Sequence, residues 1–336
     1  MSDIIVKTTG LCADFKIKDR MVRAVNRVSL SLERGKTLVI LGESGSGKST
    51  YMKALLRILP KTAAVEGQAE FLGNDLFRMS EKEFRDIRGN RMAMIYQDSL
   101  SALDPMYKVG YQIVETIRAH SSLTKAEARE RVEELFVKVG IPSPRERMNA
   151  YPHEMSGGMR QRAVIAMALC CNPCLLLADE PTTALDVTIQ AQVLELMNEL
   201  KEKLRTSLLL ITHDLGVVAQ VCDRVAIMYA GEIVESGTIA EVFDHPHHPY
   251  TIGLFGSIPS LDETAEKLKP IQGQMPDPTE LPEGCAFAPR CPYATGACRT
   301  RKPEMTGVGG TQMVRCLAHQ GVFESPELME EVRHGR

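Results

Sequence analysis

The chain has 336 residues, of which 44% are hydrophobic and 25% are charged, enough for about two globular domains. Its 40 Lys and Arg residues nearly balance 43 Asp and Glu residues, which gives a formal net charge of −3. This balance argues against a dedicated nucleic-acid binder, which would usually carry a strong basic excess. The longest unbroken apolar run, Ala163–Cys171, is far shorter than the roughly 20 residues that a membrane-spanning helix needs. No signal peptide is visible at the amino terminus, so we expect a cytoplasmic protein.

Short apolar runs alternate with helical patterns over the first 250 residues. Four of these runs predict buried strands, at residues 37–41, 175–178, 207–211 and 224–229. Apolar strands separated by helices are typical of a parallel sheet that is covered on both faces. The sequence therefore predicts an α/β fold.

A glycine-rich loop follows the first of these strands and precedes a predicted helix. It reads G-x-x-x-x-G-K-S, and its glycines allow backbone N–H groups to turn toward the phosphates of a nucleotide. The amino terminus of the helix adds partial positive charge. In this motif Lys48 reaches the β- and γ-phosphates, and the Ser49 hydroxyl ligates Mg²⁺. The predicted phosphate-binding residues are Gly42, Ser44, Gly45, Ser46, Gly47, Lys48, Ser49 and Thr50.

The stretch from about residue 98 to 170 contains no convincing strand, so we expect a helical insertion there. A capping box of Thr124 and Glu127 predicts where one of its helices begins, and Gly140 predicts where that helix ends.

Two acidic residues, Asp179 and Glu180, end the second apolar strand. Carboxylates at the carboxyl end of a strand face the crevice in which α/β sheets bind ligands. Asp179 suits Mg²⁺ binding through water, and Glu180 suits polarising an attacking water as a general base.

Three further segments occur in the order and spacing of a known family. They are Met155–Arg162 (MSGGMRQR), Pro181–Asp186 (PTTALD) and Ile211–Asp214 (ITHD). With them, residues 4–255 resemble the nucleotide-binding subunit of ABC transporters. The resemblance implies a P-loop NTPase fold with an antiparallel β subdomain and a helical insertion, in a nucleotide-binding domain of residues 1–256.

The resemblance also implies a head-to-tail dimer that holds ATP between its subunits. The signature residues Ser156, Gly157 and Gly158 would grip the γ-phosphate of the partner's ATP, because they open a helix amino terminus. Asp186 would lie at the dimer interface. Phe15 resembles the aromatic residue that stacks on adenine, with a place in the hydrophobic core as the alternative.

The catalytic residues that the resemblance implies are Glu180, His213 and Gln97. His213 would contact the γ-phosphate and hold the attacking water, although a histidine after a strand can also be purely structural. Gln97 matches the Q-loop glutamine, which touches Mg²⁺ or water and reports to the membrane subunits. The Mg²⁺ set is then Ser49, Gln97 and Asp179.

The last part of the chain has a different composition. Ten of the 18 prolines fall between Pro246 and Pro303, so we place a domain boundary near residue 257 and a second, Pro- and Cys-rich domain over residues 257–336. Residues 247–251 (HHPYT) and 289–292 (PRCP) resemble the carboxy-terminal extension of dipeptide and oligopeptide importer ATPases.

Four cysteines of this region, Cys285, Cys291, Cys298 and Cys316, are spaced C-x5-C-x6-C-x17-C. Disulfides are rare in a reducing cytosol, so the sequence favours metal ligands. The resemblance implies a [4Fe–4S] cluster with a structural role, or a redox-sensing one. A tetrahedral Zn²⁺ site is the alternative, although its usual C-x2-4-C pairs are missing. Four free thiols are a third interpretation.

The function that the resemblance implies is ATP hydrolysis that energises the uptake of di- or oligopeptides. The chain would dock on the cytoplasmic face of two transmembrane permease subunits, with a paralogous ATPase or a second copy as its dimer partner. An extracytoplasmic binding protein would deliver the peptide. The alternatives are an importer of nickel or another small solute, a soluble ABC ATPase that acts on ribosomes or DNA, and an iron–sulfur redox protein regulated by ATP.

Overall fold

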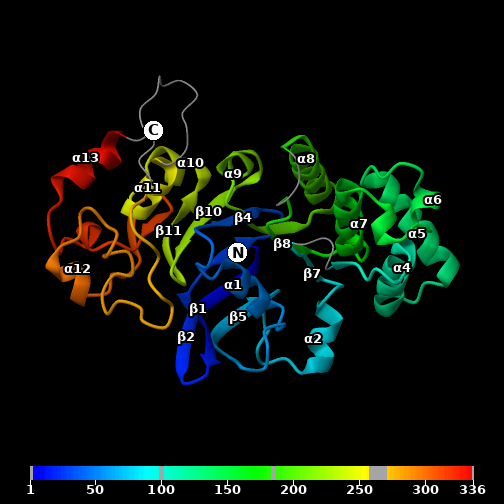
Figure 1. The fold of residues 1–336 in the computed structure, drawn as a ribbon, viewed down its shortest axis with the longest axis horizontal. Helices are drawn as coiled ribbons and strands as arrows, with labels where there is room; N and C mark the ends of the chain where they lie inside the picture. Colours follow the sequence, from blue (N-terminus) through cyan, green and yellow to red (C-terminus); the bar gives the residue numbers. More distant parts are fainter. Residues whose placement is uncertain (1–2, 98–101, 183–186, 257–270, 335–336) are drawn as a thin grey trace.

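The structure, a computed structural model, describes residues 3–97, 102–182, 187–256 and 271–334. Two sheets lie at its centre (Figure 1). A helical segment (residues 109–169) lies on one side of them, and the carboxy-terminal extension (residues 271–334) lies on the other. Within the described residues, no helix is long and apolar enough to cross a membrane.

The first sheet is antiparallel and has the strand order β2–β1–β5–β6, with β3 also paired to β1. Its strands are β1 (Ile4–Ile17), β2 (Arg20–Val28), β3 (Ser31–Glu33), β5 (Ala63–Phe71) and β6 (Asn74–Asp75). This sheet is the antiparallel β subdomain that the resemblance implies.

The second sheet has the strand order β12–β13–β11–β10–β4–β9–β8–β7. The five strands from β10 to β7 in this order run parallel, whereas β11, β13 and β12 continue the sheet antiparallel. Its strands are β4 (Thr37–Leu41), β7 (Met92–Ile95), β8 (Leu175–Asp179), β9 (Ser207–Ile211), β10 (Arg224–Tyr229), β11 (Glu232–Thr238), β12 (Thr306–Gly309) and β13 (Gln312–Val314).

Both faces of the parallel strands are covered, which explains why their sequences are apolar without alternation. Along β4, Leu38 and Ile40 pack in a hydrophobic cluster with the antiparallel sheet and helix α1 (Lys48–Leu55). Val39 and Leu41 point to the other face and pack in a second cluster, which the helical segment shares. Strands β4, β8, β9 and β10 confirm the four strands predicted from the sequence.

The helices lie beside the two sheets, in the helical segment and in the carboxy-terminal extension (Figure 1). They are α1 (Lys48–Leu55), α2 (Glu81–Ile87), α4 (Val109–His120), α5 (Lys125–Lys138), α6 (Pro144–Arg147), η1 (Pro152–Glu154), α7 (Gly157–Leu169), α8 (Val187–Leu204), α9 (Leu215–Val221), α10 (Ile239–Asp244), α11 (Pro249–Gly256), α12 (Gly296–Thr300), η2 (Leu317–Gln320) and α13 (Pro326–His334). The predicted capping box of Thr124 and Glu127 opens α5.

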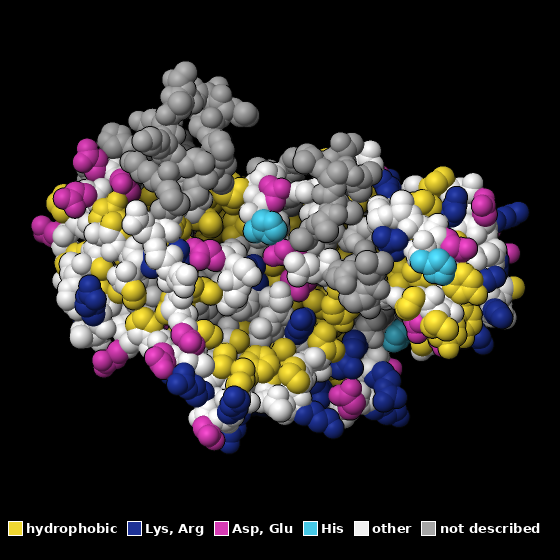
Figure 2. Space-filling model, in the orientation of Figure 1, with side chains coloured by type: hydrophobic (Ala, Val, Ile, Leu, Met, Phe, Trp, Pro, Cys, Tyr) yellow, Lys and Arg dark blue, Asp and Glu magenta, His cyan; other side chains and the backbone are white. Residues whose placement is uncertain are grey.

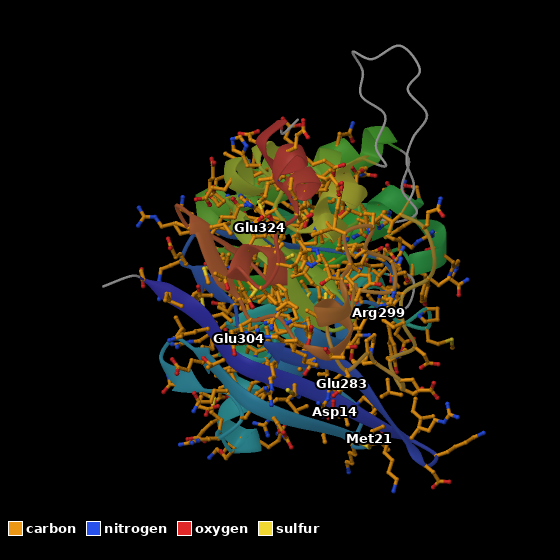
Figure 3. The ribbon with its side chains drawn as sticks, turned by 90° about the vertical axis from the view of Figure 1, so that its left-hand side faces the viewer. Asp14, Met21, Glu283, Arg299, Glu304 and Glu324 are labelled. Atoms are coloured by element: carbon orange, nitrogen blue, oxygen red, sulfur yellow. The ribbon has the colours of Figure 1, made fainter. Side chains whose placement is uncertain are left out.

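The carboxy-terminal extension packs on the rest of the chain and not as a detached unit. Strand β13 adds to β11, and Phe287 is buried in the same cluster as Tyr229 of β10. Figure 3 looks onto the extension, which lies beside the β1–β2 hairpin, and the Arg23 N–H donates to the Pro278 carbonyl. The domain boundary near residue 257 falls outside the described residues and stays a prediction.

Candidate active site

The loop between β4 and α1 has the backbone that a phosphate loop requires. Gly42, Gly45 and Gly47 have φ angles of 156°, 81° and 101°, and such left-handed conformations favour glycine. A Cβ atom at Gly42 would collide with the Met228 carbonyl oxygen, and one at Gly47 with the Ala24 carbonyl oxygen. The glycines are therefore required both for the conformation and for close packing.

The Lys48 ammonium lies inside the curve of this loop. Its Nζ donates to the carbonyl oxygens of Gly42 at 2.8 Å and Glu43 at 2.9 Å, and only 5% of the residue is exposed. Burial lowers the pKa of Lys48, while the nearby acids Glu180, Asp179 and Glu43 oppose that shift. The arrangement holds a donor where the phosphates of a nucleotide would enter.

A hydroxyl and a carboxylate lie together next to the loop. Ser49 Oγ donates to Asp179 Oδ1 at 2.8 Å, although 130 residues separate the two in sequence. Burial raises the pKa of Asp179, and the Ser49 hydrogen bond opposes the shift. Oxygen ligands of this kind are the ones that Mg²⁺ takes in phosphate sites.

Glu180 is the point at which the predicted catalytic residues meet. Gln97 Nε2 donates to Glu180 Oε2 at 3.1 Å, and His213 Nδ1 lies 3.3 Å from the same oxygen. Glu180 has φ of 46°, a conformation that is strained for a non-glycine residue and often found at functional sites. The structure thus brings together three side chains from the ends of β7, β8 and β9.

The phosphate loop and the three side chains that meet at Glu180 line one cavity with a volume of 580 Å³, a size suited to a small-molecule ligand. Asp179 is not part of its lining. Its walls are residues 41–50 apart from Ser46, together with Gln97, Glu180 and His213. Ser46, within the same loop, is fully buried. The walls also include Ala24, Leu215 and Leu254, which sequence reasoning did not find because they belong to no motif.

Other predicted nucleotide contacts do not line this cavity. Phe15 is half-buried on β1 and belongs to neither large hydrophobic cluster. Ser156 caps α7, where its Oγ accepts from the Met159 N–H at 3.3 Å, and Gly157 and Gly158 form the first turn of that helix. Asp186 lies outside the described residues.

The four cysteines of the extension do converge. Cys285, Cys291, Cys298 and Cys316 line a single small cavity, together with His248 and mostly apolar side chains. Burial raises the pKa of Cys285 to about 11 and that of Cys291 to about 12, which favours protonated thiols while no metal is bound. A bound metal ion would deprotonate them.

No metal site follows from this convergence. Among the residues whose structure is described, no three His, Cys, Asp or Glu side chains are placed to hold one metal ion. As placed in this structure, the four thiols therefore do not by themselves form the predicted [4Fe–4S] site or its Zn²⁺ alternative.

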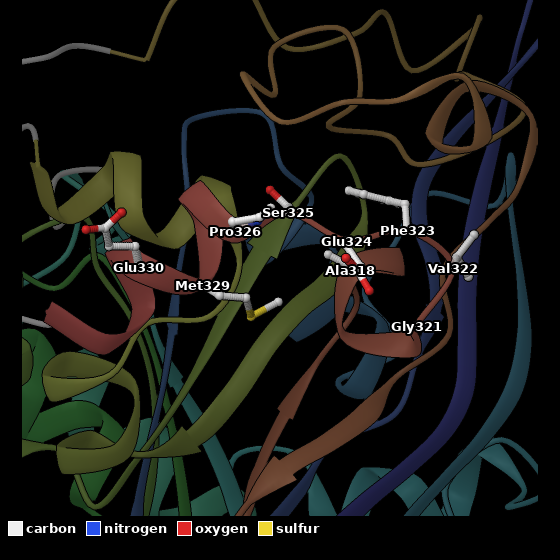
Figure 4. A pocket seen from close by; sticks show the side chains of 9 residues that line it. All are labelled: Ala318, Gly321, Val322, Phe323, Glu324, Ser325, Pro326, Met329 and Glu330. Carbon is white, nitrogen blue, oxygen red and sulfur yellow. The ribbon is translucent and has the colours of Figure 1, made fainter.

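A larger hollow, of 1040 Å³, lies elsewhere, between η2 and the start of α13 in the extension (Figure 4). Its charged lining residues are Glu324 and Glu330, and no Lys, Arg or His lines it. This charge does not suit a nucleotide phosphate.

Comparisons with known proteins agree with this geometry. The family profile described as "ABC transporter" matches residues 25–183, and the profile "Oligopeptide/dipeptide transporter, C-terminal region" matches residues 234–298. The oligopeptide transport ATP-binding protein OppD of Bacillus subtilis (strain 168) is 49% identical over 332 residues, which are 97% of this chain and 93% of that protein.

The dipeptide transport ATP-binding protein DppD of the same organism is 48% identical over 314 residues, which are 93% of this chain and 94% of that protein. Among solved structures, the dimeric ATP-binding cassette MJ0796 bound to ADP and Pi matches with a TM-score of 0.63 and 26% identity. That match covers 70% of this chain and 98% of the cassette.

Proposed function

Because the chain belongs to the family of ATP-binding subunits of oligopeptide and dipeptide ABC transporters, we propose that it is the ATP-hydrolysing subunit of a peptide importer. The observation that carries the chemistry is the meeting of Gln97 and His213 on one carboxylate oxygen of Glu180, at the wall of the phosphate-loop cavity. The profile matched over residues 234–298 favours peptides over nickel as the transported solute.

In this proposal Glu180 accepts the proton of the attacking water. His213, whose side chain is 66% exposed, hydrogen-bonds the same water or the γ-phosphate and so fixes the direction of attack. Lys48 and the loop N–H groups bind the phosphates, and Ser49, Asp179 and Gln97 hold Mg²⁺. The metal, when bound, neutralises charge that develops on the phosphate oxygens.

The second half of each ATP site would come from a partner ATPase, either a paralogue or a second copy. Ser156 and Gly157, at the start of α7, are exposed and are not part of the chain's own cavity lining. An exposed helix amino terminus of this kind suits the γ-phosphate of ATP held by the partner. The dimeric cassette among the solved structures gives a precedent for such pairing. Asp186 would lie at this interface, and Phe15 would stack on adenine.

Subunits of this family work with membrane permeases, and one exposed apolar patch suits that contact. Met106, Tyr107 and Tyr111 are 77%, 52% and 46% exposed, and the two tyrosine rings stack with centroids 5.6 Å apart. Hydrophobic side chains also appear at the surface around α4 in Figure 2. Clusters of exposed aromatic side chains are typical of interaction sites. We propose that this patch docks on a permease subunit at the cytoplasmic face of the membrane.

We also propose that the four-cysteine cavity holds a [4Fe–4S] cluster. The support is that all four side chains line one mostly apolar cavity. A cluster there would tie together segments of an extension that has little core of its own. Iron and acid-labile sulfide in near-equal amounts on anaerobically purified protein, both lost in Cys291→Ser, are expected. Zinc without sulfide, or neither element, would overturn this assignment and leave the ATPase proposal intact.

The test of the function is solute uptake into vesicles that contain the chain, its partner ATPase and both permeases. With a peptide-loaded binding protein outside and ATP inside, labelled di- to pentapeptides should accumulate, and ⁶³Ni should not. ATP-dependent nickel uptake without peptide uptake would contradict the proposal.

A further inference from the structure

The carboxy-terminal extension reaches the phosphate loop at Glu43, the residue after Gly42. Arg290 Nη1 donates to Glu43 Oε2 at 3.0 Å, across 247 positions of sequence. The Glu43 N–H donates to the Tyr250 hydroxyl at 2.9 Å, and the Glu43 carbonyl accepts from Lys48. Glu43 is thus held at its amide, its carbonyl and its side chain.

Arg290 is built into this position. Its side chain is only 5% exposed, and its Nε donates to the Gln272 carbonyl at 3.0 Å. The guanidinium carbon lies 5.7 Å from the centroid of the Tyr229 ring and 6.0 Å from that of Phe287. A planar cation packed against two aromatic rings, with several hydrogen bonds, has little freedom to move.

Glu43 is the carboxylate whose negative charge the Arg290 guanidinium offsets. Its side chain is 32% exposed and lines the cavity in which the phosphates of ATP would lie. An uncompensated carboxylate there would repel a triphosphate, and the repulsion would grow with the negative charge of the phosphates. A neutralised carboxylate, by contrast, anchors the loop without opposing the ligand.

We propose that Arg290 is a positioning residue for ATP binding, which neutralises Glu43 and fixes the first turn of the phosphate loop from the extension. This role rests on the proposed function of residues 42–50 as the ATP phosphate site. It makes the extension part of the nucleotide site, in addition to any role of its cysteines.

The test is a double-mutant cycle on the full-length protein, with the affinity for Mg-ATP and Mg-ADP measured by calorimetry. Arg290→Gln should weaken ATP binding by about tenfold and ADP binding less, because the repulsion grows with phosphate charge. Arg290→Lys, which keeps the charge, should stay within about threefold of wild type. Adding Glu43→Gln to Arg290→Gln should restore ATP binding to the level of Glu43→Gln alone.

Arg20→Gln is the matched control. Arg20 pairs with Glu280 at 3.4 Å, so this ion pair also ends on the extension but begins on the β1–β2 hairpin. Both side chains are more than two-thirds exposed and lie outside the cavity lining. The ATP affinity of the Arg20→Gln variant should equal that of wild type.

The inference is overturned if Arg290→Gln binds ATP as tightly as wild type, or if Glu43→Gln fails to restore binding. If Arg290→Gln does not fold, the comparison of Glu43→Gln with the double variant decides, since neither variant carries the Glu43 carboxylate. Equal ATP affinities are expected, and a weaker affinity in the double variant would overturn the inference. A wild-type protein that binds no ATP would instead overturn the proposed phosphate site itself.

Discussion

At the scale of single residues, Glu180 is the carboxylate that holds both Gln97 and His213 at the wall of the phosphate-loop cavity. The acid pair after an apolar strand predicts its place, because strand ends in α/β sheets face the ligand crevice. The sequence does not predict that Gln97 and His213 would share one of its carboxylate oxygens. That contact depends on a left-handed backbone at Glu180, which no local pattern indicates.

His248 gives a prediction about pH at this scale. It is buried, its Nδ1 accepts from the Tyr250 N–H at 3.0 Å, and burial lowers its pKa to about 3. Between that value and the unfolded pKa of about 6.5, the unfolded chain binds a proton that the folded chain does not. The free energy of unfolding should therefore fall as pH falls from about 6.5, by up to about 1.4 kcal/mol per pH unit.

His248→Asn should remove this part of the pH dependence, because Asn can still accept from the N–H two residues on. Urea unfolding of both proteins between pH 7.5 and 4 measures it. Glu235 has a pKa raised by burial to about 7 and opposes the trend, but it is present in both proteins. Parallel curves for the two proteins would contradict the prediction.

At the scale of elements, short apolar runs in the sequence correctly predicted the buried parallel strands. Strands β4, β8, β9 and β10 are apolar throughout because both faces of their sheet are covered. Strands β12 and β13 were not predicted. They are four and three residues long, one contains two glycines, and they form by pairing with each other and with β11.

The start of α5 gives a prediction for one element. Thr124 Oγ1 accepts from the Glu127 N–H at 3.3 Å, and the Glu127 carboxylate accepts from the Thr124 N–H at 2.7 Å. Thr124→Ala should lower the free energy of unfolding by about 1 kcal/mol, since it leaves an N–H of the first turn without its acceptor. Denaturant titration measures the loss. Ser122→Ala, at an exposed position outside the cap, should have no effect, and equal losses in the two variants would contradict the cap's role.

At the scale of the whole molecule, the site follows from strand order. Strand β9 lies between β4 and β8, so the phosphate loop, the acid pair and His213 meet at one edge of the sheet. Motif order and parallel pairing predict this meeting. They do not predict the contact between the extension and Glu43. Arg290 belongs to no nucleotide-binding motif, and only tertiary packing brings it to the loop.

The apolar patch of Met106, Tyr107 and Tyr111 gives a prediction about assembly. Tyr107→Asp should weaken docking on the permease, so that peptide uptake by the reconstituted transporter falls by roughly tenfold. ATP affinity of the isolated subunit should not change, because the patch is not part of the cavity lining. The control is Val137→Asp on α5, where an equally exposed apolar side chain (64%) lies outside the patch. Equal loss in both variants would argue against specific docking.

The central claim is that Glu180 activates the water that cleaves ATP in a peptide importer. Glu180→Gln keeps the size of the side chain but cannot take a proton, so the assembled transporter should lose at least about 100-fold in ATP hydrolysis. The variant subunit should still bind Mg-ATP, because the phosphate loop and Lys48 are unchanged. The measurement is phosphate release from vesicles that hold wild-type or variant transporter, with ATP binding determined on the same preparations. Loss of hydrolysis with binding retained is the predicted result, and hydrolysis at the wild-type rate would contradict the account.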